Sequence, residues 1–329
     1  MVHGLFALRR ISELLAVWAQ ALRQRRLDLS FRTAGGIRVR IVERPAEWMP
    51  REAIETLIDD IRIVAGGALP SGSLDYGIFQ TDGKQLSRAI LTILYDEATG
   101  KPIAFNALAV LDVVMHGRPA TVTHLGLVMV DPDIQGHGLS WILYGLTCLI
   151  LFVRNQFRSL WLSNVTQVPA VVGMVSETFS DVFPRPDPSA RRSFEHLLLA
   201  RQIMASHRSA FGVGEEAGFD EARFVISDAY TGGSDHLKKT FAVAPKHRHE
   251  EFNRFCAREL DYDRGDDVLQ IGRIDLATSR RYLLNSVPRE SLPGLLATIG
   301  FLVFQRIALP VLYWFSADKP WGVLRPMTK

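Results

Sequence analysis

A short loop with two glycines joins an apolar strand to a long apolar run. The loop reads Gln135-Gly-His-Gly-Leu-Ser140 and follows the strand-like stretch 121–130, which ends at Asp131-Pro132. The first backbone N–H groups of a helix have no intrahelical acceptor and carry the positive end of the helix dipole, so they favour a diphosphate. Gly136 and Gly138 let such a ligand approach without a Cβ in the way. The loop therefore predicts a diphosphate site, although a plain strand-to-helix turn has the same pattern.

The loop differs from the commonest nucleotide-binding motifs. No Gly-Lys-Ser/Thr follows it, as a P-loop requires, and the G-x-G-x-x-G pattern of dinucleotide-binding folds is absent. The sequence also lacks a G-x-S-x-G nucleophile elbow and a C-x-x-C pair. The loop therefore belongs to another class of phosphate site.

The elements around the loop follow from the spacing of apolar residues. Three strands joined by two short turns are predicted to form an antiparallel meander, at residues 89–95, 103–111 and 121–130. The elements predicted after the loop are a helix at 139–153, a strand at 160–163 and a helix at 169–179. The loop thus opens a helix directly after the last strand of the meander.

In this setting the loop resembles the pyrophosphate-binding loop of the GNAT N-acetyltransferase superfamily, Arg/Gln-x-x-Gly-x-Gly/Ala. Gln135 and Gly138 match that pattern, and Ser140 stands in place of the final small residue. The preceding Leu-Val-Met-Val-Asp-Pro is similar to the end of the family's fourth strand, and the resemblance covers about residues 88–180. It implies an α+β fold whose mixed, largely antiparallel sheet is splayed between its fourth and fifth strands, with acyl-CoA in that cleft.

The resemblance also implies where acetyl-CoA or a longer acyl-CoA, the acyl donor, would bind, and it implies no metal. The pantetheine arm would pair with the backbone of Leu127, Val128, Met129 and Val130. The diphosphate would rest on Gln135, Gly136, His137, Gly138, Leu139 and Ser140. Asn164, at the end of the fifth strand, would be a further cofactor contact.

Direct attack of an amine on the thioester needs a base, donors for the oxyanion and an acid for the leaving thiolate. His124, near the start of the fourth strand, is the first candidate for the base because imidazole titrates near neutral pH. A structural histidine hydrogen-bonded at a strand end is the alternative, and His137 would contact a phosphate or point to solvent. The family's usual acid is a tyrosine, but the alignment puts Met174 there. Ser176 on the same helix, or water, is the predicted substitute.

Composition sets the broad class of the protein. The chain has 329 residues, 47% of them hydrophobic and 22% charged, which is enough apolar material for a sizeable core. Thirty-eight Lys and Arg against 35 Asp and Glu give a net charge of +3, too balanced to indicate a nucleic-acid partner. Two cysteines cannot form a disulfide framework, so a reducing, cytoplasmic location is predicted.

The two ends of the chain carry the features that suggest a membrane. Residues 1–44 hold nine Arg and three acidic residues, a local charge of +6, and their first part predicts an amphipathic helix. Residues 292–315 are almost wholly apolar, and they suit a monotopic contact better than a span because Pro310 interrupts the run. Peripheral membrane contact through both segments is one prediction. Packing on the protein's own core, or a homodimer interface, is the alternative.

Three parts of the chain follow from this reading. They are a basic amphipathic N-terminal helix at 1–35, a GNAT-like domain at 36–276 with a helical insertion near 189–210, and an apolar C-terminal extension at 277–329. Strands near 37–42, 222–229 and 267–274 would complete the sheet. His247, His249 and the acidic run 261–267 read as solvated surface rather than metal or calcium ligands.

The predicted function is acyl-CoA-dependent transfer of an acyl group to an amine. A small polar amine is the first acceptor class. A long-chain N-acyltransferase that makes an N-acylated lipid at a membrane surface is the alternative. A third hypothesis is a non-catalytic GNAT-fold scaffold or sensor that binds CoA, because Met174 stands at the position of the acid.

Overall fold

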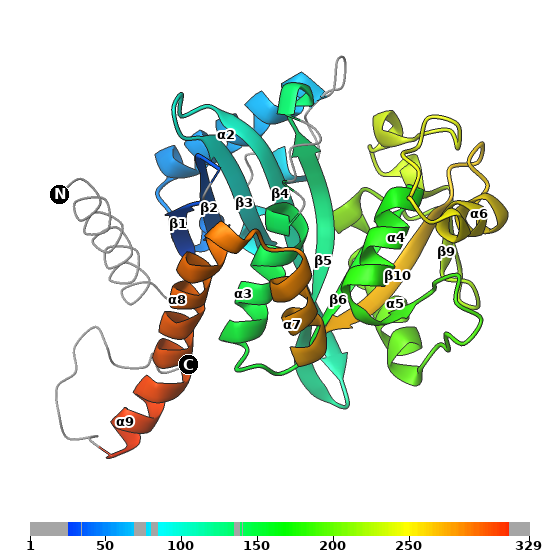
Figure 1. Ribbon diagram of the computed structural model, residues 1–329. Coiled ribbons are helices and arrows are strands. Elements are labelled where there is room, and N and C mark those ends of the chain that lie inside the picture. The colour runs from blue at the N-terminus through cyan, green and yellow to red at the C-terminus, as the bar shows by residue number, and fades with distance from the viewer. Residues whose placement is uncertain are drawn as a thin grey trace.

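The computed structural model describes residues 26–33, 35–68, 77–79, 85–134, 139 and 141–315. They form a mixed α/β fold built on one sheet with the strand order β1-β2-β3-β4-β5-β6-β10-β9-β8, in which β7 also pairs with β10 (Figure 1). The strands are β1 (Asp28–Arg32), β2 (Ile37–Glu43), β3 (Ala89–Asp96), β4 (Pro102–Met115), β5 (Arg118–Val130), β6 (Leu160–Thr166), β7 (Ser180–Phe183), β8 (Gly218–Asp220), β9 (Val225–Ser227) and β10 (Asp267–Ile274). Neighbouring strands are antiparallel except β5 and β6, which are parallel. The predicted fold class, a largely antiparallel mixed sheet with helices, is confirmed.

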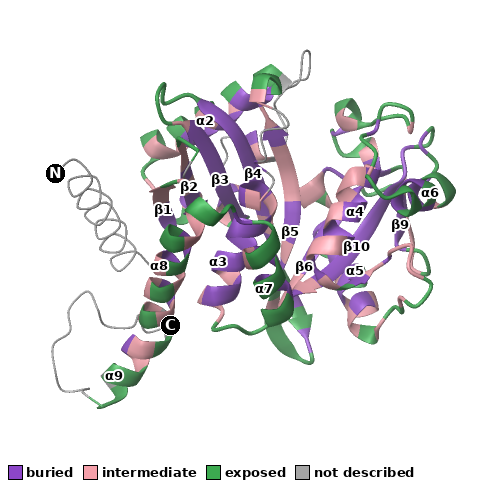
Figure 2. Ribbon diagram, viewed as in Figure 1, coloured by how far each residue is buried: buried purple, intermediate pink, exposed green. Residues whose placement is uncertain are grey.

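Helices cover both faces of the sheet. They are α2 (Arg51–Ala68), α3 (Thr147–Arg154), α4 (Pro169–Thr178), α5 (Phe194–Ser206), α6 (Glu250–Glu259), α7 (Leu276–Asn285), α8 (Leu292–Val303) and α9 (Leu309–Phe315). One core joins α3, α7 and α8 to one face of the sheet, and α2 and α5 pack on the other face in two separate clusters. Because side chains alternate along a strand, β3, β4 and β5 contribute buried residues to the clusters on both faces. Figure 2 shows how much of these central strands is buried.

The meander forms where the sequence predicted it. Its strands β3, β4 and β5 include all the residues expected at 89–95, 103–111 and 121–130. Gly100 and Gly117, with φ of 72° each, lie in the two turns, a conformation that favours glycine. The helix expected at 169–179 and the helical insertion expected near 189–210 are also present, as α4 and α5.

The N-terminal boundary differs from the prediction. Residues 28–32, expected in the N-terminal helical part, form β1, which pairs with β2 as an antiparallel hairpin. Gly35-Gly36 lies in the turn of this hairpin. Alternating residues such as Leu27 and Leu29 are buried against the sheet, which explains why a strand forms here. The amphipathic stretch before residue 26 lies outside the described residues.

Two further elements differ from the prediction in length or type. Only Val225–Ser227 of the predicted strand 222–229 is extended, because Phe224 has a positive φ of 56° in the turn before it. The apolar run after the glycine loop begins as a π-helix, Trp141–Leu146, before it continues as α3. In the described part of the chain, no helix is both long and apolar enough to cross a lipid bilayer.

Candidate active site at the seam between β5 and β6

The parallel strands β5 and β6 are paired over only part of their length. Their ladder joins Val122–Leu125 to Trp161–Asn164, whereas β5 continues to Val130. The residues of β4 opposite the end of β5, from Ala104 to Ala107, are all buried, but Gly126, Leu127 and Val128 are half-buried. The sheet therefore opens at a seam between β5 and β6, as the resemblance implied for the fourth and fifth strands of the core.

A β-bulge lies at the point where this seam begins. Ala107 and Ala109 on β4 are two positions apart, but their partners on β5, Leu127 and His124, are three positions apart. Gly126 sits in the bulge, and a Cβ there would lie 2.1 Å from the Ala107 carbonyl oxygen. Only glycine fits this approach, so the bulge turns the end of β5 away from the ladder with β6.

The helix that follows the glycine loop is fixed to the sheet by buried polar contacts. The Asn106 side-chain amide donates to the Leu143 carbonyl, and the Thr92 and Thr147 hydroxyl oxygens are 2.5 Å apart. These contacts hold the first turns of the helix over β3 and β4. Such buried polar contacts fix the position of the helix, although Asn106 Oδ1 has no hydrogen-bond partner among the described residues.

Helix α7 also holds the start of this helix. The Tyr282 hydroxyl donates to the Trp141 carbonyl at 2.6 Å, and its ring occupies the space over Gly145. A Cβ on Gly145 would lie 2.0 Å from Tyr282 Cε2. Helix α7 therefore helps to position the first turns of this helix.

Most of the predicted diphosphate loop lies outside the described residues. These are Gln135, Gly136, His137, Gly138 and Ser140, so their role in binding a diphosphate stays a prediction. Leu139 is described, and its side chain is buried in the core shared with α3.

Half-buried apolar side chains from three elements pack against the core cluster shared with α3, and we call them the apolar lining. Val128 and Val130 come from β5, Val171 and Met174 from α4, and Trp141 and Tyr144 from the π-helix. Met129, the remaining predicted pantetheine contact besides Leu127, is buried on the opposite face with the α2 cluster. Because Val128 and Val130 belong to the unpaired end of β5, this face of the seam is apolar, which suits a pantetheine arm or an acyl chain.

Asn164 lies at the last rung of the β5–β6 ladder, where the seam opens. It is 4% exposed, and its side-chain Nδ2 has no hydrogen-bond partner among the described residues. Its cross-strand neighbour Gln270 has an equally unpartnered Oε1. A direct contact between the two amides, or a ligand amide that offers one acceptor and one donor, would satisfy both atoms.

His124 lies on the other face of the sheet from Asn164. It pairs with Ser163 in the ladder, its Nδ1 is 3.0 Å from the Ser163 Oγ, and its ring stacks on Phe211 with centroids 4.9 Å apart. Burial lowers the pKa of His124 to about 3, so the imidazole is neutral at neutral pH and only weakly basic. This geometry favours the structural alternative, and the role of His124 as the base stays a prediction.

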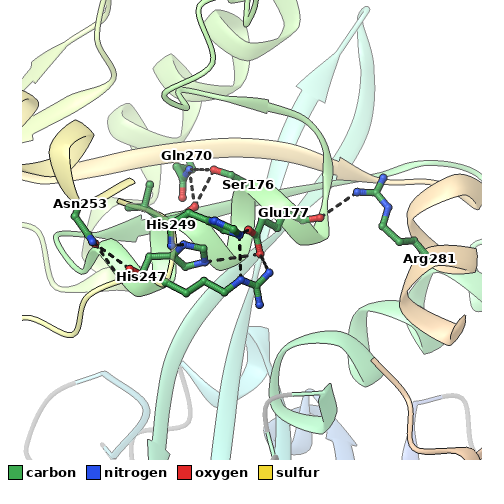
Figure 3. Close-up of polar contacts among 9 residues, drawn as sticks. Ser176, Glu177, His247, His249, Asn253, Gln270 and Arg281 are labelled. Atoms are coloured by element: carbon green, nitrogen blue, oxygen red, sulfur yellow. Dashed lines mark hydrogen bonds and ion pairs between the residues drawn. The ribbon is translucent and has the colours of Figure 1, made fainter. Parts of the chain in front are cut away.

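The Ser176 hydroxyl is committed to the core. It donates to the Val172 carbonyl at 2.8 Å and accepts from Gln270 Nε2 at 3.1 Å (Figure 3). Because Ser176 lies on α4 and His124 on the opposite face, the structure does not bring the two predicted catalytic residues together. Tyr144, in the apolar lining, was not predicted. Its phenol is the one titratable group of that lining, and burial raises its pKa.

The histidines at 247 and 249 converge on one carboxylate. His247 Nε2 and His249 Nε2 lie 3.7 and 3.4 Å from the two carboxylate oxygens of Glu177, and the Arg248 guanidinium lies 2.7 Å from one of them (Figure 3). The described residues contain no group of three or more His, Cys, Asp or Glu side chains arranged to hold a metal ion. These contacts tie the loop before α6 to the end of α4.

A polar pocket of about 350 Å³ lies on the His124 face of the sheet. Its walls come from the turn before β3, the middle of β4 and the end of α5 with the turn that follows; they include Gln85, Ser87, Arg88, Ala109, Ser206, His207 and Ser209. Ala109 is the ladder partner of His124. Arg88 is the only lining side chain with a permanent charge, and its guanidinium lies 3.9 Å from the exposed Asp112 carboxylate.

Comparisons with known proteins leave the family open. No family model and no curated protein matches the chain. Among solved structures, the ribosomal-protein-S5-alanine acetyltransferase from Vibrio fischeri is similar at 14% identity, over 41% of this chain and 74% of that chain, with a TM-score of 0.29. A likeness of this size shows neither family nor function, so the functional case rests on the seam itself.

The sequence carried no signal for the tyrosine of the apolar lining or for the pocket. Tyr144 lies in an apolar run that is read as core, and the pocket joins three segments that are far apart in the chain. The bulge had one signal, the single Gly126 within an apolar strand, because an isolated glycine in a strand marks a bulge or a close backbone approach.

Proposed function

We propose that the protein is an acyl-CoA-dependent acyltransferase that transfers the acyl group to an amine by direct attack on the thioester. The observation that carries the proposal is the open seam, in which the β5–β6 ladder stops at Leu125 and Asn164 beside the Gly126 bulge. An extended, amide-containing ligand can pair with the free edge of a strand as another strand does. The pantetheine arm of CoA has that chemistry.

The donor would enter the seam along the end of β5. Backbone groups from Leu127 to Val130 would pair with the pantetheine amides, and the unpartnered amide of Asn164 would contact the arm. The diphosphate would rest on the loop from Gln135 to Ser140. The apolar lining from Val128 to Met174 suits either acetyl-CoA or a longer acyl-CoA.

Tyr144 is our candidate for the acid that protonates the leaving thiolate. Its raised pKa keeps the phenol protonated at neutral pH, and it belongs to the same lining as Met174, the residue at the family's usual acid position. The Ser176 hydroxyl already donates its hydrogen bond to the Val172 carbonyl, so Ser176 is a weaker candidate for the acid than Tyr144. The bond that forms joins the amine to the acyl carbon, and the bond that breaks is C–S.

The acceptor amine would approach from the pocket beside Ala109. His124, the register partner of Ala109, is close behind this wall and is neutral, so it can accept a hydrogen bond. Its low pKa makes it a poor final proton acceptor, and water in the polar pocket would carry the proton away. The serine hydroxyls and Arg88 favour a small polar acceptor.

A lipid-like amine is the second acceptor class. It is supported by the exposed apolar side chains of α8 and α9, which place an apolar surface on the same chain as the seam. A third candidate, a CoA-binding scaffold or sensor in the cytoplasm, is supported by Met174 at the acid position. The scaffold differs from the two transferases in turnover, because it binds CoA without releasing it from acyl-CoA. The two transferases differ from each other in the acceptor amine.

The test is release of free CoA from acetyl-CoA and from a long-chain acyl-CoA, measured by thiol reagent, with a panel of polar and lipid-like amines. We expect amine-dependent release that Tyr144→Phe reduces strongly. His124→Gln, which keeps a side-chain donor and acceptor, should retain most of the rate if His124 only positions the strands. Binding of acyl-CoA without amine-dependent release would support the scaffold, and no binding would reject all three candidates.

A further inference from the structure

The C-terminal helix has two apolar sides. From Leu292 to Phe315 the chain is helical without a break, through α8, a π-helical segment at Phe304–Ala308 and α9. The core-facing side buries Leu295, Thr298, Leu302 and Leu309. Arg306 is the only charged residue among residues 292–315. One apolar side is enough to dock a helix on its domain, so the second side needs another explanation.

The second side is exposed along its whole length. Its large apolar side chains are Leu296 (53% exposed), Phe304 (44%), Ile307 (37%), Val311 (51%), Leu312 (45%), Trp314 (85%) and Phe315 (81%), which we call the apolar stripe. Leu296, Phe304, Ile307, Val311 and Phe315 follow one another at steps of eight, three, four and four residues, so the stripe follows the helix axis. Figure 2 shows α9 largely exposed, and Figure 1 shows it extending away from the sheet.

The stripe has the shape of an interfacial helix rather than of a span. Twenty-four helical residues rise about 36 Å, but one side of this helix is already bound to the protein core, which a lipid-surrounded span excludes. A helix with one lipid-facing apolar stripe instead lies flat, with its side chains about 5–10 Å into the headgroup boundary. Trp314 and Phe315 at its end are residues of the kind that settle at this depth.

The sequence carries a basic segment at each end of the chain. Residues 1–26 contain five Arg and one Glu, and residues 316–329 contain three basic residues and one Asp, so the two segments carry +4 and +2. Leu27 and Leu29, which follow the first segment, belong to the same core cluster as Leu295 and Leu302. Such charges attract anionic headgroups with about 1 kcal/mol for each basic residue near the surface.

We propose that the apolar stripe docks the protein on an anionic phospholipid membrane surface. The stripe supplies the apolar contact, and the basic residues in the two terminal segments of the sequence supply the electrostatic attraction. Docking of this kind is independent of acyl transfer, because none of the stripe residues lines the seam or the polar pocket.

The experiment is flotation of the full-length protein with vesicles of phosphatidylcholine and phosphatidylglycerol, and with phosphatidylcholine alone. We expect flotation with the anionic vesicles and much less with the neutral ones. Val311→Asp and Phe315→Ser should each weaken binding about tenfold or more, because each removes a large apolar contact. Both side chains are exposed, so the fold should tolerate the changes.

Matched controls keep the test specific to the stripe. Val243→Asp and Phe194→Ser change side chains that are 68% and 71% exposed and lie outside α8 and α9, and they should leave flotation unchanged. Absence of flotation by the intact protein, or equal loss in control and stripe variants, would overturn the proposal. A dimer in solution that Val311→Asp converts to a monomer, without vesicle binding, would instead assign the stripe to a second copy of the chain.

Discussion

Leu125 on β5 and Asn164 on β6 are partners in the last rung of the only parallel ladder in the described sheet. Beyond them β5 continues for five residues that do not pair with β6. The last residues of β6 stay paired with β10. The bulge at Gly126 follows directly, so the parting of the two strands is built into the backbone. The proposed donor site therefore depends on a few main-chain contacts more than on any one reactive side chain.

Gly126→Ala tests whether the bulge sets the seam. The new methyl group would lie 2.1 Å from the Ala107 carbonyl oxygen, and backbone atoms on both strands would have to move. We expect a loss of about 1–3 kcal/mol in the free energy of unfolding, measured by urea denaturation, together with weaker acyl-CoA binding. Gly66→Ala is the matched control, because a Cβ there meets nothing within 4 Å and alanine favours the helix. Equal stability of the two variants would disprove the role of the bulge.

Gly145→Ala tests whether α7 positions the helix after the glycine loop. The methyl group would lie 2.0 Å from the ring of Tyr282, so the variant should lose about 1–3 kcal/mol of stability. In a Tyr282→Leu background the same substitution should cost much less, because the ring is gone. A double-mutant cycle measures this coupling. Additive losses would show that the ring and Gly145 act independently.

Tyr144→Phe tests the proposed acid. We expect kcat to fall about a hundredfold and the Kd for acyl-CoA to stay the same, because only a proton donor is removed. Tyr95→Phe is the control: Tyr95 is buried on β3, and its hydroxyl donates to Asp60 at 2.6 Å, away from the apolar lining. An unchanged kcat in Tyr144→Phe would leave water as the acid.

The part of the fold that the sequence predicted is the part set by local pattern. Alternating apolar residues and turns containing Gly100 and Gly117 are enough to define the meander, because neighbouring strands pair with short connections. The pairing of β6 with β10 joins residues about a hundred positions apart, and the exact limits of that ladder follow from three-dimensional packing. Local pattern also could not separate β1 from the end of a helix, because only its pairing with β2 stabilises it.

For the same reason, the sequence predicted the backbone positions of the candidate site better than its catalytic side chains. Leu127 to Val130 and Asn164 fall at the seam because their positions depend on the order of the strands. His124 and Ser176 were chosen by residue type, and the type of a side chain does not reveal its face or its hydrogen-bond partners. In the structure, His124 is buried beside Ser163. The Ser176 hydroxyl donates a hydrogen bond to the Val172 carbonyl.

Stability should depend on pH through Asp267, at the start of β10. Burial raises its pKa from 3.8 to about 7, although it accepts a hydrogen bond from the Tyr230 hydroxyl at 3.0 Å. A raised folded pKa means that the native state holds the proton more tightly than the unfolded state. Its stabilising effect is therefore complete below about pH 4 and is lost as the pH rises towards 7, by at most about 1.4 kcal/mol per pH unit.

Asp267→Asn should remove this dependence, because the amide keeps an acceptor for Tyr230 and does not ionise. The measurement is thermal or urea unfolding between pH 4 and pH 8 for the native protein and the variant. Asp59→Asn, at a carboxylate whose side chain is 71% exposed, is the control and should follow the native curve. Parallel curves for the native protein and Asp267→Asn would contradict the assignment.

The central claim is that acyl-CoA lies in the seam between β5 and β6, and hydrogen exchange tests it most directly. Amide exchange, followed by mass spectrometry with and without acetyl-CoA, reports the backbone of Gly126 to Val130 separately from that of β3 and β4. We predict that acetyl-CoA slows exchange in Gly126 to Val130 and around the loop that follows, and leaves the paired strands β3 and β4 unchanged. Unaltered exchange in Gly126 to Val130 at saturating acetyl-CoA would contradict it.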